Sequence, residues 1–220
     1  MKVEDIASMS IRGFLAEDEG MRLYELASVA SKIGPCLEIG SYCGKSTLYM
    51  AFGYHGTGRV VFSVDHHRGS EEQQPGQEYF DEELFDEDTG MVDTFSTFRR
   101  NISRVSMEDT IVPIISTSGV LAKNWATPLG MVFIDGSHSY SSAFMDYSAW
   151  APQILPGGIF VIHDIFSNPS KGGQAPYYMY SRALDSGLFA ELPMVNTLGA
   201  LRRLDTGEVP EHIAGIRDWG

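Results

Sequence analysis

Short apolar runs alternate with helix-like segments along most of the chain, and most of these runs end next to a polar residue. The runs cover residues 35–39, 60–64, 110–115, 131–134 and 158–162. Strands separated by helices form parallel sheets with right-handed crossovers. The pattern therefore predicts an α/β protein with a doubly wound sheet.

The segments between and after these runs complete the expected order. Helical spacing of apolar residues is found at 4–15, 19–32, 45–52, 91–104, 119–125, 139–151 and 176–186. Two further strands are expected at 188–194 and 198–204, and their short connection favours an antiparallel pair. The sequence thus predicts a mostly parallel seven-stranded sheet with an antiparallel C-terminal strand. It also predicts one domain over 1–220, with N-terminal helices in 1–32.

Bulk properties narrow the functional classes. The chain has 220 residues, enough for one domain with a sizeable core. It has no apolar run of the roughly 20 residues that a membrane helix needs, and its N-terminus does not read as a secretory signal. We therefore expect a cytoplasmic protein. The net charge of −13 makes nucleic acid an unexpected partner, because phosphate backbones are bound by Lys and Arg clusters.

Much of the acidic charge is local. Ten acidic residues and no Lys or Arg lie between positions 71 and 93. The segment 66–90 is long for a connection, and such loops are often lids or binding segments. Two interpretations stay open: a solvated loop, or a negative rim that favours cationic ligands.

The stretch "LEIGSYCGKST" at 37–47 places a glycine turn between an expected strand and an expected helix. A triphosphate-binding loop needs four residues between its glycines, and a dinucleotide-binding turn needs a further glycine. Three residues separate Gly40 from Gly44 here, and the further glycine is missing. Glu38 would repel a triphosphate and would suit a positively charged ligand or sugar hydroxyls. The turn therefore disfavours both nucleotide classes.

Polar residues gather where the expected strands end, and doubly wound sheets bind ligands at that edge. The residues are Glu38, Asp65, Ser116, Asp135, His163 and Asp164. Asp65 ends the second strand, where a doubly wound nucleotide site places its ribose-binding carboxylate. A small-molecule site at this edge is expected.

Four stretches, "CLEIGSYCGKST", "VFSVDHH", "MVFIDGSHSY" and "LPGGIFVIHD", follow one another with a spacing that identifies a family. They resemble the main motifs of class I S-adenosylmethionine-dependent methyltransferases, over roughly residues 20–204. The resemblance implies the Rossmann-like methyltransferase fold and S-adenosylmethionine as cofactor. It implies methyl transfer to a small molecule, most naturally to a hydroxyl oxygen. The alternatives are a non-catalytic protein that binds this cofactor, and another transferase or a hydroxylase-like enzyme on the same fold.

The resemblance also implies roles for individual residues. Asp65 would bind the ribose and His66 would lie beside the adenine, while Asp135 would face the methionine ammonium or the methyl-transfer centre. The implied cofactor-binding residues are Glu38, Gly40, Ser41, Gly44, Ser46, Asp65, His66, Ser116, Thr117, Ser118 and Asp135.

An acceptor hydroxyl or amine must lose a proton, which calls for a base with a pKa near the working pH. His163 and His138 are the candidate bases, because histidine is the side chain closest to that pKa. With Asp135 they form the predicted catalytic set. Some relatives use magnesium, and Asp135 and Asp164 could supply two oxygen ligands. His163 could join them if the ion were a softer transition metal.

Two loops are expected to define the acceptor, at 65–80 and 167–180. The predicted substrate contacts are Arg68, Gln174, Tyr177 and Tyr178. Packing in the core would explain the tyrosines equally well. The N-terminal helices are expected to cover the site or to form the contact of a homodimer.

Overall fold

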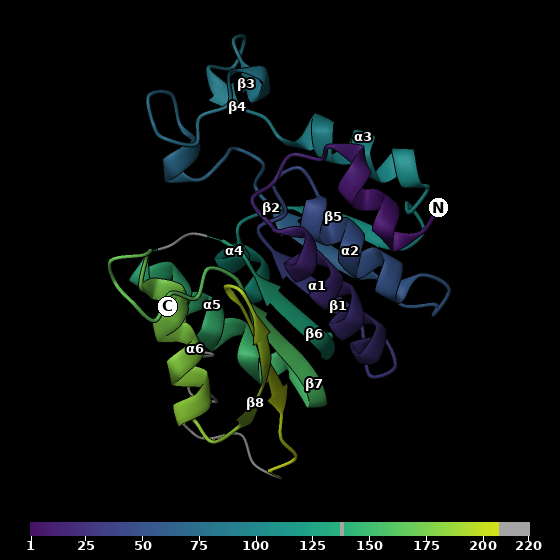
Figure 1. The fold of residues 1–220 in the computed structure, drawn as a ribbon, viewed down its shortest axis with the longest axis vertical. Helices are drawn as coiled ribbons and strands as arrows, with labels where there is room; N and C mark the ends of the chain where they lie inside the picture. The colour runs from purple at the N-terminus through teal and green to yellow at the C-terminus, as the bar shows by residue number, and fades with distance from the viewer. Residues whose placement is uncertain (137–138, 207–220) are drawn as a thin grey trace.

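A seven-stranded sheet forms the centre of the computed structural model, which describes residues 1–136 and 139–206 (Figure 1). Its strand order is β5-β2-β1-β6-β7-β9-β8. The strands are β1 (Cys36–Ile39), β2 (Val61–Asp65), β5 (Ile111–Ile115), β6 (Leu129–Ile134), β7 (Ile154–Ile162), β8 (Phe189–Val195) and β9 (Leu198–Arg203).

The sheet is parallel from β5 to β7. β1 pairs in parallel with both β2 and β6, and β9 pairs antiparallel with β7 and β8. The chain runs outward from β1 through β2 to β5, then returns to the other side of β1 for β6 and β7. The predicted doubly wound, mostly parallel sheet with an antiparallel C-terminal strand is confirmed. Its order reverses between β1 and β6, where such sheets bind ligands.

Helices cover both faces of the sheet (Figure 1). One face carries α1 (Glu17–Ala30), α2 (Lys45–Tyr54) and α3 (Phe95–Val105). The other face carries α4 (Ser118–Ala122), α5 (Tyr140–Trp150) and α6 (Ala175–Asp185). Leu23, Leu48 and Phe98 are buried in the first core, and Trp150 and Met179 in the second. The central strands are buried on both faces and are therefore mostly apolar, as parallel strands usually are. Glu38 in β1 and Ser63 in β2 are buried polar exceptions.

The N-terminal segment differs from the predicted helix at 4–15. A 3-10 helix, η1, spans Val3–Met9 and ends where Ser10 adopts a left-handed backbone with φ of 52°. Gly13, with φ of 150°, lies against the side chain of Lys45, and Lys45 donates a hydrogen bond to the Leu15 carbonyl at 2.6 Å. Residues 10–16 are therefore a connection held against the start of α2. The spacing of apolar residues alone could not distinguish one helix over 4–15 from a short helix followed by a connection.

The "LPGG" stretch lies inside β7 rather than before it. Leu129 pairs with Ile154, and Met131 pairs with Ile159, so four residues of β7 face one residue of β6. Gly157 has φ of 81°, which only glycine adopts readily. The predicted turn is thus a bulge within the strand.

The acidic segment 66–90 contains short elements rather than one open loop. These are η2 (Glu71–Gln73), η3 (Glu82–Leu84) and β3 (Phe85–Asp86), which pairs with β4 (Met91–Val92). The helix predicted at 91–104 consequently begins at Phe95. The role of the segment as a lid stays a prediction. In the described ranges, no helix has both the length and the apolar character needed to cross a membrane.

Candidate active site

A cavity of about 870 Å³ opens at the carboxyl ends of the central strands. Residues 12–15 and several residues of the acidic segment form part of its wall. Its size lies in the usual range for small-molecule sites. The predicted site residues that line it are Gly40, Ser41, Ser46, Asp65, His66, Ser116, Thr117, Ser118, Asp135, His163 and Asp164.

The other predicted site residues are not in this wall. Glu38 is fully buried beneath it. The predicted site residues that the structure describes outside this wall are Glu38, Gly44, Arg68, Gln174, Tyr177 and Tyr178. His138 lies outside the described residues.

The residues predicted to contact the acceptor lie outside the cavity wall because of the orientation of the first turn of α6. Pro176, the second residue of α6, lines the cavity. Each residue turns a helix by about 100°, so Tyr177 and Tyr178 point elsewhere, and each is 38% exposed. Gln174 donates hydrogen bonds to the carbonyls of Phe166 and Gly172 at 2.9 and 3.1 Å. Its part is therefore to shape the loop that lines the cavity.

The glycine turn after β1 requires glycine at its first position. Gly40 has φ of 87°, and a Cβ atom there would lie 2.1 Å from the carbonyl oxygen of Asp135. Gly44 has φ of 89° and precedes the first residue of α2. The turn therefore passes directly against the end of β6, which brings the two strand ends to one side of the cavity.

Asp65 holds this turn in place. Its Oδ2 atom accepts hydrogen bonds from the backbone amides of Ser41 and Tyr42 at 2.9 and 2.8 Å. Its Oδ1 atom accepts one from the amide of His67 at 2.7 Å. A carboxylate offers about four lone-pair sites, so capacity remains for a ligand hydroxyl at the cavity. Asp65 is thus both the anchor of the turn and a candidate ligand contact.

Glu38 is a buried carboxyl group beneath the turn. Three hydroxyls donate to it, from Ser46 and Thr47 at 2.5 Å each and from Ser63 at 2.7 Å. Burial raises the pKa of Glu38 to about 7, against the lowering effect of these hydrogen bonds, and the charge of Asp135 raises it further. Glu38 therefore supports the turn from below rather than lining the cavity.

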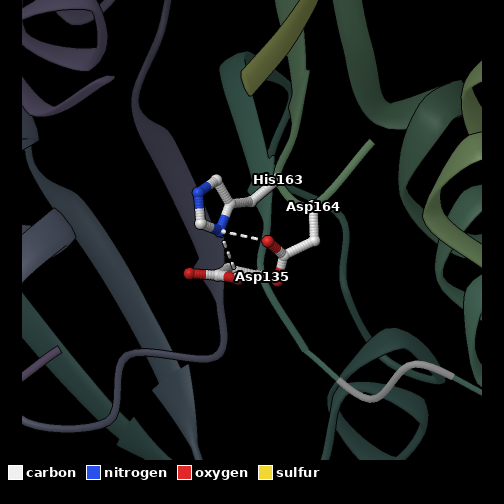
Figure 2. A group of neighbouring side chains, drawn as sticks. All are labelled: Asp135, His163 and Asp164. Carbon is white, nitrogen blue, oxygen red and sulfur yellow. Dashed lines mark hydrogen bonds and ion pairs between the residues drawn. The ribbon is translucent and has the colours of Figure 1, made fainter. Parts of the chain in front are cut away.

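Three side chains converge at the ends of β6 and β7 (Figure 2). The Nδ1 atom of His163 lies 3.1 Å from Oδ1 of Asp135 and 3.7 Å from Oδ1 of Asp164. On the other side of the ring, Nε2 lies 3.1 Å from Oε2 of Glu19 in α1. His163 is only 4% exposed. The imidazole is thus held between carboxylates on both of its nitrogens.

The neighbouring carboxylates and the burial of His163 determine the pKa values of His163 and Glu19. Burial lowers the pKa of His163, but hydrogen bonds with Asp135 and Glu19 and the charges of Asp135 and Asp164 raise it to about 11. Burial raises the pKa of Glu19, but hydrogen bonds from His163 and the Ala16 amide lower it to about 2. A base must be neutral to accept a proton, so this geometry does not favour the predicted role of His163 as general base.

The same three side chains could hold a divalent cation. One ligand atom each from Asp135, His163 and Asp164 lies within 4.8 Å of the others. Imidazole nitrogen with carboxylate oxygen suits a transition metal better than Mg²⁺, which prefers oxygen ligands. A cation at Nδ1 would take the place of the proton there. The donor set therefore fits a metal of this kind.

Two buried acids in this region were not predicted. Glu19 lies in α1, far from any strand end, and no local pattern marks it. Asp146 lies in α5 and is 6% exposed. It shares the buried face of that helix with Ala143 and Trp150. A carboxylate at the apolar spacing of a helix is a signal that could have identified it.

A family model described as a methyltransferase domain matches residues 37–165, more than half of the chain. Solved structures of methyltransferases share the fold. A Podospora anserina methyltransferase bound to SAH has 15% identity and a TM-score of 0.62, over 87% of this chain and 80% of that one. A Bacillus cereus O-methyltransferase in complex with SAH has 16% identity and a TM-score of 0.59, over 90% and 87%.

The Streptomyces achromogenes O-methyltransferase TomG in complex with SAM has 11% identity and a TM-score of 0.60, over 90% of this chain and 93% of that one. Because these identities are low, the structures establish a shared fold and nothing more specific. The family match rests on the segment that runs from β1 to just beyond the end of β7, which contains most of the cavity wall. This chain belongs to the family of methyltransferase domains.

Proposed function

We propose that this chain uses S-adenosylmethionine to methylate a hydroxyl oxygen of a small molecule. The observation that carries the proposal is the cavity at the reversal of strand order, with a glycine turn anchored by Asp65 on one side and Asp135 on the other. The neighbouring folds bound to SAH or SAM support the choice of cofactor.

The charges around the cavity suit a sulfonium cofactor better than a phosphate. Asp65, Asp135 and Asp164 all line it. Lys45 occupies the position of a phosphate-loop lysine, but its ammonium donates to the Leu15 carbonyl at 2.6 Å. Arg12 is paired with Asp81 at 2.9 Å. The carboxylates would therefore attract the ammonium and sulfonium groups of the cofactor.

Methyl transfer requires alignment above all, because the methyl group moves in line from sulfur to the acceptor. The turn and Asp65 would hold the nucleoside, and Asp135, which lines the same cavity, would face the methionine ammonium or the acceptor. Asp135 and Asp164 are the carboxylates that could receive the acceptor's proton. A divalent cation held by Asp135, His163 and Asp164 would supply Lewis-acid chemistry that lowers the pKa of an acceptor hydroxyl.

Calorimetric titration with S-adenosylhomocysteine tests the cofactor site. We expect micromolar binding by the native protein and at least about 10-fold weaker binding by Asp65→Ala, because the turn loses its anchor. Arg68→Ala is the matched control, since Arg68 is exposed and outside the cavity wall. Absence of binding at millimolar ligand would contradict the proposal.

Labelled S-adenosylmethionine with a panel of phenols, catechols and amines tests the reaction. Methylated phenol or catechol is the expected product. Cofactor binding without any product would instead support a non-catalytic binding protein. Full turnover in excess EDTA would exclude an essential metal at Asp135, His163 and Asp164.

A further inference from the structure

Three aromatic side chains in the cavity wall form a cluster that we call the aromatic corner: Phe14, Tyr42 and Tyr79. The rings of Phe14 and Tyr79 meet edge to face, with centroids 5.1 Å apart and an interplanar angle of 72°. The rings of Phe14 and Tyr42 have centroids 6.0 Å apart and an interplanar angle of 33°. The N-terminal connection, the glycine turn and the acidic segment each supply one ring, so three separate segments of the chain meet here.

Packing within the protein does not account for the aromatic corner. Phe14 is 63% exposed and Tyr79 is 43% exposed. Tyr42 is the base of the corner, because it is partly buried against a small apolar cluster beneath it. Adjoining apolar groups that stay exposed in a cavity wall gain most when a ligand covers them. The corner is therefore a surface on which a ligand would rest.

Backbone contacts hold both exposed rings in the wall. Leu15, next to Phe14, is buried, and its carbonyl accepts a hydrogen bond from Lys45 at 2.6 Å. The backbone amide of Tyr79 donates to the Glu72 carbonyl at 3.1 Å, which joins Tyr79 to η2. The aromatic corner is therefore a fixed part of the folded wall.

Carboxylates outnumber cations around the cavity. Of the described residues that line it, seven carry a carboxyl group and three are Lys or Arg. Two of these carboxylates adjoin the aromatic corner, because Glu78 directly precedes Tyr79 and Glu71 belongs to η2. The field at the corner is therefore negative, which attracts cations and repels anions.

The cations of the wall do not cancel this field at the corner. Arg12 is already paired with Asp81 at 2.9 Å and with Glu83. Lys45 is bound to the backbone of the N-terminal connection. Lys171 lies in the segment after β7, which supplies no ring to the corner. A ligand group at the corner thus meets ring faces and carboxylates, the combination that binds an ammonium ion.

We propose that the methyl acceptor carries an ammonium group, which binds at the aromatic corner through the ring faces and through the charges of Glu71 and Glu78. This inference rests on the proposed function, because it assigns a substrate class to the same cavity. A ring face attracts a cation electrostatically, and a neutral group of the same shape gains no such attraction. The corner therefore selects for charge rather than for size.

Two probes of the same shape test this selection. Choline and 3,3-dimethyl-1-butanol both end in a branched trimethyl group, but only choline is charged. Proton NMR follows the methyl signal of each probe during titration, with S-adenosylhomocysteine present to fill the cofactor part of the cavity. We expect the native protein to bind choline about 10-fold more tightly than the neutral probe. Equal affinities would overturn the inference.

Variants at Tyr79 separate the ring from its apolar bulk. Tyr79→Leu keeps an apolar side chain without a ring face, so the preference for choline should fall below about 3-fold. Tyr79→Phe keeps the face and should keep the preference, whereas Phe14→Leu should behave like Tyr79→Leu. Tyr178→Leu is the matched control, because Tyr178 is 38% exposed and lies outside the wall. A preference that survives both leucine variants would overturn the inference.

Turnover gives a second measurement of the same selection. Tyramine and 4-hydroxyphenylacetate present the same phenol with an ammonium or a carboxylate group. Tyramine should have a KM at least about 10-fold lower, and Tyr79→Leu should raise that KM with little change in kcat. The reverse order of the two KM values would overturn the inference.

The remaining outcomes separate the inference from the proposed function. Failure of the native protein to bind S-adenosylhomocysteine would remove the proposed function, and the assignment of the cation as an acceptor with it. Binding of S-adenosylhomocysteine with equal affinities for the two probes would leave the proposed function standing and remove the inference alone. If sedimentation shows that Phe14→Leu abolishes a dimer of the native protein, the corner is a contact between copies, which also overturns the inference.

Discussion

The two charged sides of the cavity are built in different ways. At the glycine turn, Glu38 and Asp65 accept hydrogen bonds from neutral hydroxyls and amides of neighbouring elements, no more than 25 residues away. At the ends of β6 and β7, His163 meets Glu19 across 144 residues. Glu19 in turn binds Thr197 across 178 residues. At the glycine turn, the carboxylates are held by neutral partners that are near in the sequence. At the ends of β6 and β7, the contacts join charged groups that are far apart in the sequence.

The difference predicts different consequences of mutation. A carboxylate that loses a hydroxyl partner loses one hydrogen bond of modest net strength. A buried ion that loses its counter-ion keeps its desolvation cost and gains nothing in return. The region at β6 and β7 should therefore be far more sensitive to single changes than the turn.

The largest effect is expected for Glu19→Gln. The change leaves the buried ring of His163 without the charge on its Nε2 side, and we expect the free energy of unfolding to fall by about 4 kcal/mol. The pKa of His163 is raised from 6.5 to about 11 and that of Glu19 is lowered from 4.5 to about 2. The stabilisation is therefore complete between about pH 4.5 and pH 6.5, is lost as pH rises through about 11, and is also lost as pH falls through about 2. Urea denaturation at pH 6 measures it.

Thr197→Val is the control for this change, because the Thr197 hydroxyl donates to Glu19 at 2.9 Å without touching His163. It should cost about 1 kcal/mol. If Glu19→Gln costs no more than Thr197→Val, the charged pair contributes little and the comparison fails.

A smaller effect that depends on pH is expected for Glu38→Gln. The pKa of Glu38 is raised from 4.5 to about 7, so the folded protein binds this proton more tightly than the unfolded chain does. The stability associated with it is full below pH 4.5 and is lost as pH rises through about 7. As pH rises between these limits, the free energy of unfolding of the native protein should fall by about 3 kcal/mol relative to that of the variant. Denaturation curves of both proteins at pH 5 and pH 8 measure this difference. If the stabilities of the native protein and the variant change equally with pH, burial does not raise the pKa of Glu38.

The smallest effect is expected for Arg12→Ala, at an exposed charge cluster outside both sides. Arg12 pairs with Asp81 and Glu83, and its side chain is 36% exposed. Exposed pairs contribute little, so unfolding should change by less than about 1 kcal/mol at low salt and by less still in 1 M NaCl. Proteolysis within 66–93 should nevertheless become faster, because the pair joins this segment to the N-terminal connection. A loss above about 2 kcal/mol would mean that the pair behaves like the buried one.

The predictable part of the cavity follows from the geometry of parallel strands. Asp65, Asp135 and His163 were identified because each comes directly after an apolar run, and parallel strands present such residues at one edge. The spacing between Gly40 and Gly44 excluded a phosphate loop, and the position of Lys45 against Leu15 agrees with that exclusion. These inferences needed only the order of residues along the chain.

Other features could not be predicted, because they depend on how surfaces meet. Tyr177 and Tyr178 were expected at the acceptor, but the phase of α6 points Pro176 into the cavity instead. The role of His163 as a base stays a prediction, but nothing in the sequence shows that Glu19 lies 3.1 Å from its Nε2 atom. The burial of Asp146 has a signal in the apolar spacing of its helix, but its hydrogen bond with Ser118 has none, because that contact joins two separate helices.

By itself, the sequence determined the fold and the edge of the sheet at which the cavity lies, because the periodicities of strands and helices are local and polar residues mark the strand ends. Only the tertiary structure decided which of those polar groups are buried, paired or open to a ligand. Burial and pairing set the charge of a carboxyl or imidazole group. They arise when α1, α5 and the β8–β9 turn pack against the sheet, across separations that no local pattern records.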